Sequence, residues 1–159
     1  MTAQVTLYTR ANCPLCDKAR EAMRASGAAF DLAEVDIDRE PALQERYTND
    51  VPVIHIGGSE AFRHRVDPQL FAQYLRAGLT GWRVVDGHHL EKEYRFPDFA
   101  KGLDFTNRIG ALAEAQNHHL DIHLAWGRVR VTLWSHDVNA ITERDFRLAA
   151  LVDGDVPEA

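Results

Sequence analysis

Two adjacent histidines, His118 and His119, are the residues whose types and spacing most clearly suggest chemistry. Glu114 lies four residues before His118, Trp126 seven after His119, and His136 ten after Trp126. Histidine has an ordinary pKa of about 6.5, so its acid and base forms are both accessible near neutral pH. A pocket holding such residues could protonate a leaving hydroxyl group and remove a proton from a neighbouring nitrogen. The pattern therefore predicts an acid-base site in the second half of the chain.

The expected secondary structure would bring these histidines together. Apolar residues at helical spacing predict a long helix over residues 99–117, with His118 and His119 at its end. Two apolar segments around Gly127 predict a hairpin over residues 121–135. If this hairpin folds back along the helix, His136 approaches the histidine pair. We therefore expect all three histidines in one pocket.

This succession, E-x-x-x-H-H followed by an aromatic residue, a histidine and Asp145, resembles the pterin-4a-carbinolamine dehydratases over about residues 70–152. The resemblance implies dehydration of 4a-hydroxytetrahydropterin to quinonoid dihydropterin, without a metal or bound cofactor. It implies that His118 and His136 carry proton transfer and that His119 helps to hold the pterin ring. Glu114 would orient His118 or anchor the edge of the ring. The substrate-binding positions implied by the resemblance are Glu114, Trp126 and Asp137.

Two departures and two alternatives accompany this resemblance. The family usually has Pro after His-His, where this chain has Leu120, and Gly-Gly before the last helix, where it has Asn139-Ala140. The histidine pair could instead simply end a helix, where positive charge is favoured. A metal site of three histidines is the second alternative. The remaining histidines match no family position and are expected to be surface or sheet residues: His55, His64, His88, His89 and His123.

A second chemical signal is the segment Cys13-Pro14-Leu15-Cys16, which follows a strand-like stretch over residues 4–9. Cys13 would begin a helix, where free N–H groups and the helix dipole favour a thiolate. Cys16, one turn later, could resolve a mixed disulfide. A zinc half-site is an alternative, although zinc needs about four ligands and no second cysteine pair exists. An inert or regulatory dithiol is the other alternative.

The first half resembles the glutaredoxin-like proteins of thioredoxin fold over about residues 4–79. The matching segments are Leu7-Tyr8-Thr9-Arg10, Cys13-Pro14-Leu15-Cys16, Val35-Asp36-Ile37-Asp38 and Val51-Pro52-Val53. The resemblance implies redox catalysis by Cys13 and Cys16, a cis-Pro52 facing the dithiol, and backbone groups of Val51 that bind a thiol substrate. The stretch that holds the glutathione carboxylate in glutaredoxins corresponds to residues 57–60. That stretch appears here only as Gly57-Gly58-Ser59-Glu60, so a thiol partner is expected and the sequence leaves open whether it is glutathione.

The fold class follows from the order of the predicted elements. An α/β thioredoxin-like domain over residues 1–79 has the order β-α-β-α-β-β-α, and residues 80–159 add β-β-α-β-β-α. The dehydratase family has an α+β domain with the order α-β-β-α-β-β-α, so one helix is missing from this count. We therefore expect either that the helix over residues 67–78 serves both domains or that one domain is trimmed.

Composition narrows the classes of partner. The chain has 159 residues, 45% of them hydrophobic and 26% charged, a net charge of -6 and no basic cluster, which argues against nucleic acid as a ligand. It has no apolar run of about 18 residues and no signal peptide, so we expect a cytoplasmic protein without a membrane partner. Domains of roughly 75 to 80 residues have small cores, so we expect a homodimer or homotetramer built on the second half.

Sequence alone leaves three hypotheses for function. The first is a pterin-4a-carbinolamine dehydratase with a fused thiol-disulfide redox domain. The second is a noncatalytic dehydratase-like binding or assembly module that carries a redox-sensing dithiol. In the third, the dithiol is the working site and the second domain supplies recognition or dimerisation. Pterin turnover separates the first hypothesis from the second, and disulfide reduction tests the third.

Overall fold

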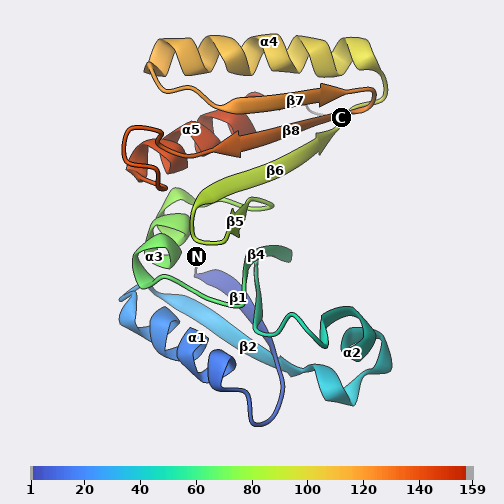
Figure 1. Ribbon diagram of the computed structural model, residues 1–159, viewed down its shortest axis with the longest axis vertical. Coiled ribbons are helices and arrows are strands. Elements are labelled where there is room, and N and C mark those ends of the chain that lie inside the picture. Colours follow the sequence, from blue (N-terminus) through green and yellow to red (C-terminus); the bar gives the residue numbers. More distant parts are fainter. Residues whose placement is uncertain (1, 157–159) are drawn as a thin grey trace. The chain divides into compact units, whose positions relative to one another are not determined.

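The chain divides into two compact units, and the boundary along the chain falls between Gly87 and His88. The computed structural model describes residues 2–156 (Figure 1). Residues 80–87 belong to the first unit, although the sequence suggested a boundary after residue 79. No helix within residues 2–156 combines the length and apolar character that crossing a membrane requires.

The first unit contains a mixed four-stranded sheet. Its strands lie in the order β2 (Phe30–Asp36), β1 (Ala3–Thr9), β3 (Val53–Ile56) and β4 (Ser59–Arg63). β1 is parallel to β2 and antiparallel to β3, and β3 is antiparallel to β4. The helices are α1 (Pro14–Ala25), α2 (Pro41–Tyr47) and α3 (Pro68–Ala77), and a short 3-10 helix η1 (Ile37–Arg39) precedes α2. Apart from η1, this is the predicted order of elements.

Alternating side chains give this sheet two buried faces. Leu7 and Ile54 are paired in register between β1 and β3, and both are completely buried. On β4, Phe62 lies against Phe71 and Tyr74 of α3, with ring centroids 6.0 and 5.8 Å apart. The opposite face carries a second cluster around Ile37, Tyr47 and Val53, which packs under η1 and α2. Helices packed on both faces of the sheet therefore hold β1, the strand that leads to Cys13, in place.

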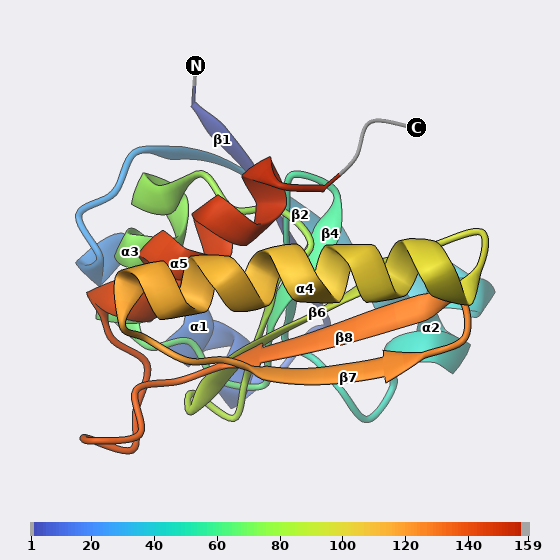
Figure 2. The same ribbon diagram turned by 90° about the horizontal axis from the view of Figure 1, so that it is seen from above.

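The second unit contains an antiparallel sheet covered on one face by two helices. β6 (His89–Arg95), β8 (Arg128–Leu133) and β7 (Asp121–Ala125) lie in that order, and β5 (Arg83–Val85) precedes the unit boundary. α4 (Phe99–Gln116) runs along the sheet with α5 (Glu143–Gly154) beside it (Figure 2). A Cβ atom at Gly102 would lie 3.2 Å from Leu124, so glycine allows α4 to approach β7 closely.

β8 is an inner strand of this sheet, and its apolar side chains are buried. Val129, Val131 and Leu133 have no exposed surface and alternate with more exposed residues along the strand. The neighbouring strands and helices therefore bury this strand without a second subunit. The strand at the edge of the sheet is β7.

Candidate active site

A cavity of about 260 Å³ lies in the second unit, where the end of α4, the end of β8 and the start of α5 meet. Its lining residues are Asn117, His118, His119, Trp134, His136, Asp137 and Arg144. The predicted convergence of the three histidines is therefore confirmed. We call this space the histidine cavity.

A left-handed turn brings the histidine pair to the cavity. Asn117 ends α4 with a φ of 49°, a conformation that asparagine tolerates better than most residues. The backbone N–H of His118 then donates to the carbonyl of Ala113, 3.1 Å away. The chain leaves the helix axis at this point, so two consecutive side chains reach the cavity.

His118 is held by a buried carboxylate. Its Nε2 lies 2.6 Å from Oδ1 of Asp145, which is completely buried, while His118 is 8% exposed. The other oxygen of Asp145 accepts hydrogen bonds from the Ser135 hydroxyl, at 2.9 Å, and from the Thr142 backbone N–H, at 2.8 Å. A carboxylate accepts hydrogen bonds and does not donate them, so Nε2 of His118 carries a proton. Nδ1 is the nitrogen left for a substrate.

Asp145 is the functional residue that the sequence interpretation missed. It occupied a family position in the sequence, but no role was assigned to it. Glu114 was expected either to orient His118 or to anchor the pterin ring, and its Oε1 lies 2.8 Å from Nε2 of His119 rather than against His118. Asp145 also forms a capping box with Thr142 at the start of α5. That capping signal is visible in Thr142-Glu143-Arg144-Asp145, but it does not reveal which distant histidine the acid contacts.

His136 lies on the open side of the cavity, and its side chain is exposed. The ring of Trp134 lies 4.3 Å from the His136 ring, with an angle of 33° between the ring planes. The following residue, Asp137, forms a 2.7 Å ion pair with Arg144. The hydrogen bond from Arg144 lowers the pKa of the Asp137 carboxyl group, so Asp137 stays ionised in this wall of the cavity. Trp134 and Arg144 were not predicted from the sequence, since a single tryptophan or arginine carries no spacing signal.

Trp126 does not line the histidine cavity. It occupies the turn between β7 and β8 and is 74% exposed, whereas His118 and His136 lie at the other end of the hairpin. Its assignment to substrate binding stays a prediction. In the Asn139-Ala140 pair, the left-handed conformation falls on Asn139, whose φ is 50°, so Ala140 does not have to adopt it.

Among residues 2–156, no three His, Cys, Asp or Glu side chains are arranged to hold a metal ion. His55 instead contacts the Tyr47 hydroxyl at 3.3 Å, and burial lowers the pKa of its imidazole. His64 lies 3.5 Å from Asp50. His123 lies on β7 with an exposed side chain and is paired in register with Arg130.

The first unit holds the dithiol at the start of α1. Cys13 is the N-cap residue, and Cys13 and Cys16 form a disulfide with their Cα atoms 5.2 Å apart. The backbone N–H of Cys16 donates to Sγ of Cys13, at 3.2 Å, and Cys16 is completely buried whereas Cys13 is partly exposed. The peptide bond between Val51 and Pro52 is cis, as the resemblance implied.

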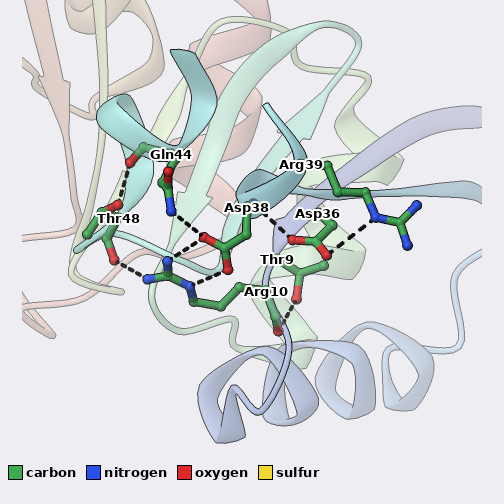
Figure 3. Close-up of polar contacts among 7 residues, drawn as sticks. All are labelled: Thr9, Arg10, Asp36, Asp38, Arg39, Gln44 and Thr48. Carbon is green, nitrogen blue, oxygen red and sulfur yellow. Dashed lines mark hydrogen bonds and ion pairs between the residues drawn. The ribbon is translucent and has the colours of Figure 1, made fainter. Parts of the chain in front are cut away.

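An arginine-centred group of polar contacts fixes the segment before Cys13 (Figure 3). Arg10 donates to both carboxylate oxygens of Asp38, at 3.1 and 2.6 Å, and to the carbonyl of Thr48, at 3.0 Å. Gln44 also donates to Asp38, at 3.1 Å. These contacts connect the end of β1 with η1 and α2. The stretch over residues 57–60, expected to match a glutathione site, forms the turn from β3 into β4.

Comparison with known proteins gives two family matches. Residues 64–154 match the pterin 4 alpha carbinolamine dehydratase family model, and residues 4–76 match that of a glutaredoxin-like domain. The two matches overlap over residues 64–76, which include most of α3. Both sequence resemblances are therefore confirmed at the level of the family.

Individual relatives match the second half of the chain. A protein of Rubrobacter xylanophilus named for pterin-4-alpha-carbinolamine dehydratase is 53% identical over 79 residues, which are 50% of this chain and 74% of that protein. A relative of the same name in Alkaliphilus metalliredigens is 47% identical over 81 residues, covering 51% of this chain and 73% of that protein.

One solved structure supports the same fold for the second half of the chain. The crystal structure of a transcriptional coactivator/pterin dehydratase from Brucella melitensis is similar, with a TM-score of 0.50 and 32% identity. The match covers 54% of this chain and 90% of that one. A pterin dehydratase-like protein described as a RuBisCO assembly factor in the alpha-carboxysome matches with a TM-score of 0.43 and 25% identity, covering 50% of this chain and 93% of that chain.

Proposed function

Since the chain belongs to the pterin-4a-carbinolamine dehydratase family and carries an amino-terminal glutaredoxin-like domain, we propose that its histidine cavity removes water from a 4a-hydroxytetrahydropterin. The observation that carries this proposal is the convergence of His118, His119 and His136 on one cavity, with His118 held by the buried Asp145. The product is quinonoid dihydropterin.

The reaction needs one acid and one base. The bond between C4a and the hydroxyl oxygen breaks, and the hydroxyl takes a proton from the acid and leaves as water. The base removes the proton from N5, and the electron pair of that N–H bond forms the new double bond between N5 and C4a. No oxidant or reductant is consumed. Two histidines that differ in their surroundings can divide these roles.

The surroundings of the histidines suggest which one does what. Asp145 holds the proton on Nε2 of His118, which leaves Nδ1 as the base for the N5 proton, and it stabilises the imidazolium that forms. His136, on the exposed side of the cavity, is then the acid that protonates the leaving hydroxyl. His119, paired with Glu114, is placed to hold the pterin ring, and the Asp137–Arg144 pair offers polar groups to its edge.

Water loss from a chemically prepared carbinolamine pterin tests the proposal directly. The purified full-length protein should accelerate the absorbance change of dehydration well above the spontaneous rate in the same buffer. Variants at His118 or His136 should return the rate toward the spontaneous one. Pterin binding without acceleration would support a noncatalytic binding module instead, and absence of both would favour an assembly role.

The dithiol supports a second activity, thiol-disulfide exchange. Cys13 caps α1, and its sulfur accepts the Cys16 N–H, which favours the thiolate once the disulfide is reduced. The Cys13 thiolate attacks a partner disulfide and releases one thiol, and Cys16 then attacks Cys13 and releases the second. The chain is left with the Cys13–Cys16 disulfide, and a thiol such as glutathione must reduce it. Reduction of a protein disulfide by the reduced chain, lost in Cys13→Ser, tests this activity.

A further inference from the structure

Two histidines outside the histidine cavity form a chain of hydrogen bonds in the second unit. Nδ1 of His88 lies 3.1 Å from Nδ1 of His89, and Nε2 of His88 lies 2.9 Å from Oδ1 of Asn139. The amide oxygen only accepts, so His88 donates from Nε2 and, when neutral, accepts on Nδ1 from His89. At the other end, Nε2 of His89 lies 3.9 Å from Glu91. The acceptor on Asn139 therefore sets the direction of the two hydrogen bonds, from His89 to His88 and from His88 to Asn139.

The same two histidines surround Trp134, which lines the cavity. The ring centroid of Trp134 lies 5.6 Å from that of His88 and 6.2 Å from that of His89. The neighbour of Trp134 towards the cavity is His136, at 4.3 Å. The indole therefore lies between the His88–His89 pair and a proposed catalytic histidine. His89 begins β6, as expected of a sheet residue, and both histidines also contact Trp134.

Asn139 connects this group to the turn that follows His136. Residues 137–140 leave β8 and are closed by two backbone hydrogen bonds between Ser135 and Ala140, of 2.9 and 3.3 Å. Within the turn, Asn139 has a φ of 50°, and its side chain carries the bond from His88. The turn is otherwise exposed, with Val138 57% accessible. His88 thus provides a side-chain anchor for a turn that begins next to His136 and Asp137.

We propose that His88, His89, Trp134 and Asn139, the His88 cluster, position His136 for proton transfer. Trp134 restricts the His136 ring from the side, and the bond from His88 to Asn139 holds the turn that follows it. The inference deepens the proposed dehydration and rests on it. His88, His89 and Asn139 do not line the cavity, so they are positioning residues and not catalytic ones.

The cluster predicts a spectroscopic signature in the resting protein. Because the His136 ring lies 4.3 Å from the indole, its carbon-bound protons should show a ring-current shift in NMR spectra of the full-length chain. His88→Ala and Asn139→Gly should each reduce this shift. Glycine adopts a φ of 50° without strain, so Asn139→Gly removes the side-chain amide while the turn can keep its backbone conformation. Asn139→Asp keeps an acceptor oxygen and should retain the shift.

Turnover provides the second measurement. His88→Ala and Asn139→Gly should lower kcat by about 5- to 100-fold, because a displaced catalytic group loses effective alignment, while KM changes little. Asn139→Asp should recover most of kcat. The matched control is His123→Ala, an exposed histidine of the same unit that lies on β7, outside the cavity. It should alter neither kcat nor the His136 signals.

The two measurements separate the outcomes. If His88→Ala and Asn139→Gly leave the His136 signals unchanged, the positioning role is wrong, whatever the turnover. If the signals move while kcat stays at the wild-type value, the cluster holds the turn without serving catalysis, and the proposal is also overturned. If the wild-type protein does not dehydrate the pterin at all, the proposed function fails. The positioning role in catalysis then fails with it, even if the NMR spectra show that the cluster orders His136.

Discussion

At the scale of single residues, Asp145 joins the cavity to the end of a helix. One carboxylate oxygen bonds His118, and the other accepts from Ser135 and from the backbone of Thr142 at the start of α5. The group that fixes the protonated nitrogen of His118 is therefore also part of the capping box. Catalysis and local stability should depend on the same side chain.

Removal of either proposed proton-transfer histidine gives the first prediction. His118→Ala and His136→Ala should each lower kcat for dehydration by about 100- to 10,000-fold, the usual contribution of general acid-base groups. Stopped-flow absorbance measures the rate, and circular dichroism checks that the fold survives. Wild-type turnover in both variants would refute the assignment of these roles.

Asp145→Asn gives the second prediction. The amide is nearly isosteric but carries donor hydrogens, so it no longer dictates which His118 nitrogen is protonated, and kcat should fall by about 100-fold or more. The capping box should weaken as well, with a loss of roughly 1 to 3 kcal/mol in the free energy of unfolding. Urea unfolding measures that loss. Glu143→Gln, a change in the same turn outside the cavity, is the control for general effects on α5.

Some of these residues were predictable from the sequence and others were not, for a physical reason. His118, His119 and His136 could be found because the helix and hairpin that bring them together have strong local patterns. The pairing of His118 with Asp145 spans 27 residues and depends on how α5 packs, which no local pattern encodes. The position of Trp134 between His88 and His136 likewise depends on the register between β6 and β8.

At the scale of elements, the start of α1 sets the difference between the two cysteines. Cys13 is the partly exposed N-cap residue, and Cys16 lies one turn inside the helix with no exposed surface. After reduction, Cys13 should therefore react with iodoacetamide at neutral pH much faster than Cys16. Mass spectrometry of partly labelled protein measures the two rates. Equal and slow labelling would indicate two buried structural thiols.

The contacts of Arg10 with η1 and α2 give a prediction about pH. The hydrogen bond and charge of Arg10 lower the pKa of Asp38 from its usual value of 3.8. The stabilisation from this contact is therefore fully present above the pKa that Asp38 has in the unfolded chain, about 4. It is lost as the pH falls through the lower pKa of Asp38 in the folded protein. Asp38→Asn removes the ion pair at every pH.

Thermal unfolding between pH 2 and pH 6 tests this. The wild-type Tm should fall more steeply below pH 4 than that of Asp38→Asn, and the two proteins should differ most near neutral pH. Asp121→Asn is the control, because Asp121 is exposed on β7 and has no ion pair within residues 2–156. Parallel Tm curves for the wild type and Asp38→Asn would show that the Arg10–Asp38 contact does not stabilise the fold.

The limits of the helices and strands were the feature of this protein that the sequence predicted best. Strand and helix limits agree with the sequence patterns to within about one or two residues, because proline and cap residues mark most of the helix ends. Pro41 begins α2, Asp67 caps α3, and Asp98 caps α4. The place of β8 in its sheet was not predictable, since an apolar alternating strand suits an edge or a centre equally well until its neighbours are known.

At the scale of the whole molecule, the chain joins a dithiol unit and a histidine unit whose sites lie within separate folds. The histidine cavity is built entirely from residues 117–144, and the disulfide lies within α1 and its cap. Neither site takes a residue from the other unit. Substitutions at Cys13 should therefore leave the composition of the histidine cavity unchanged, and the two proposed activities can be measured independently.

Self-association through the second unit is the last prediction. β7 is an edge strand, and α4 exposes Phe99 and Leu103 one turn apart, with 44% and 41% of their surfaces accessible. A small unit with an open strand edge and apolar side chains on its covering helix gains by burying them against a second copy. We expect a homodimer or homotetramer at micromolar concentration by light scattering, for the full chain and for a chain that begins at residue 67.

Substitutions distinguish the two surfaces. Leu103→Glu should shift the mass towards a smaller species if α4 forms the contact, whereas Ile122→Pro on β7 should do so if strands pair edge to edge. Lys101→Glu, a charge change on the same helix, controls for net charge. If light scattering shows that both the full and the shortened chain are monomers, assembly through the second unit is excluded. The exposed side chains of α4 would then not contact a second copy of the chain.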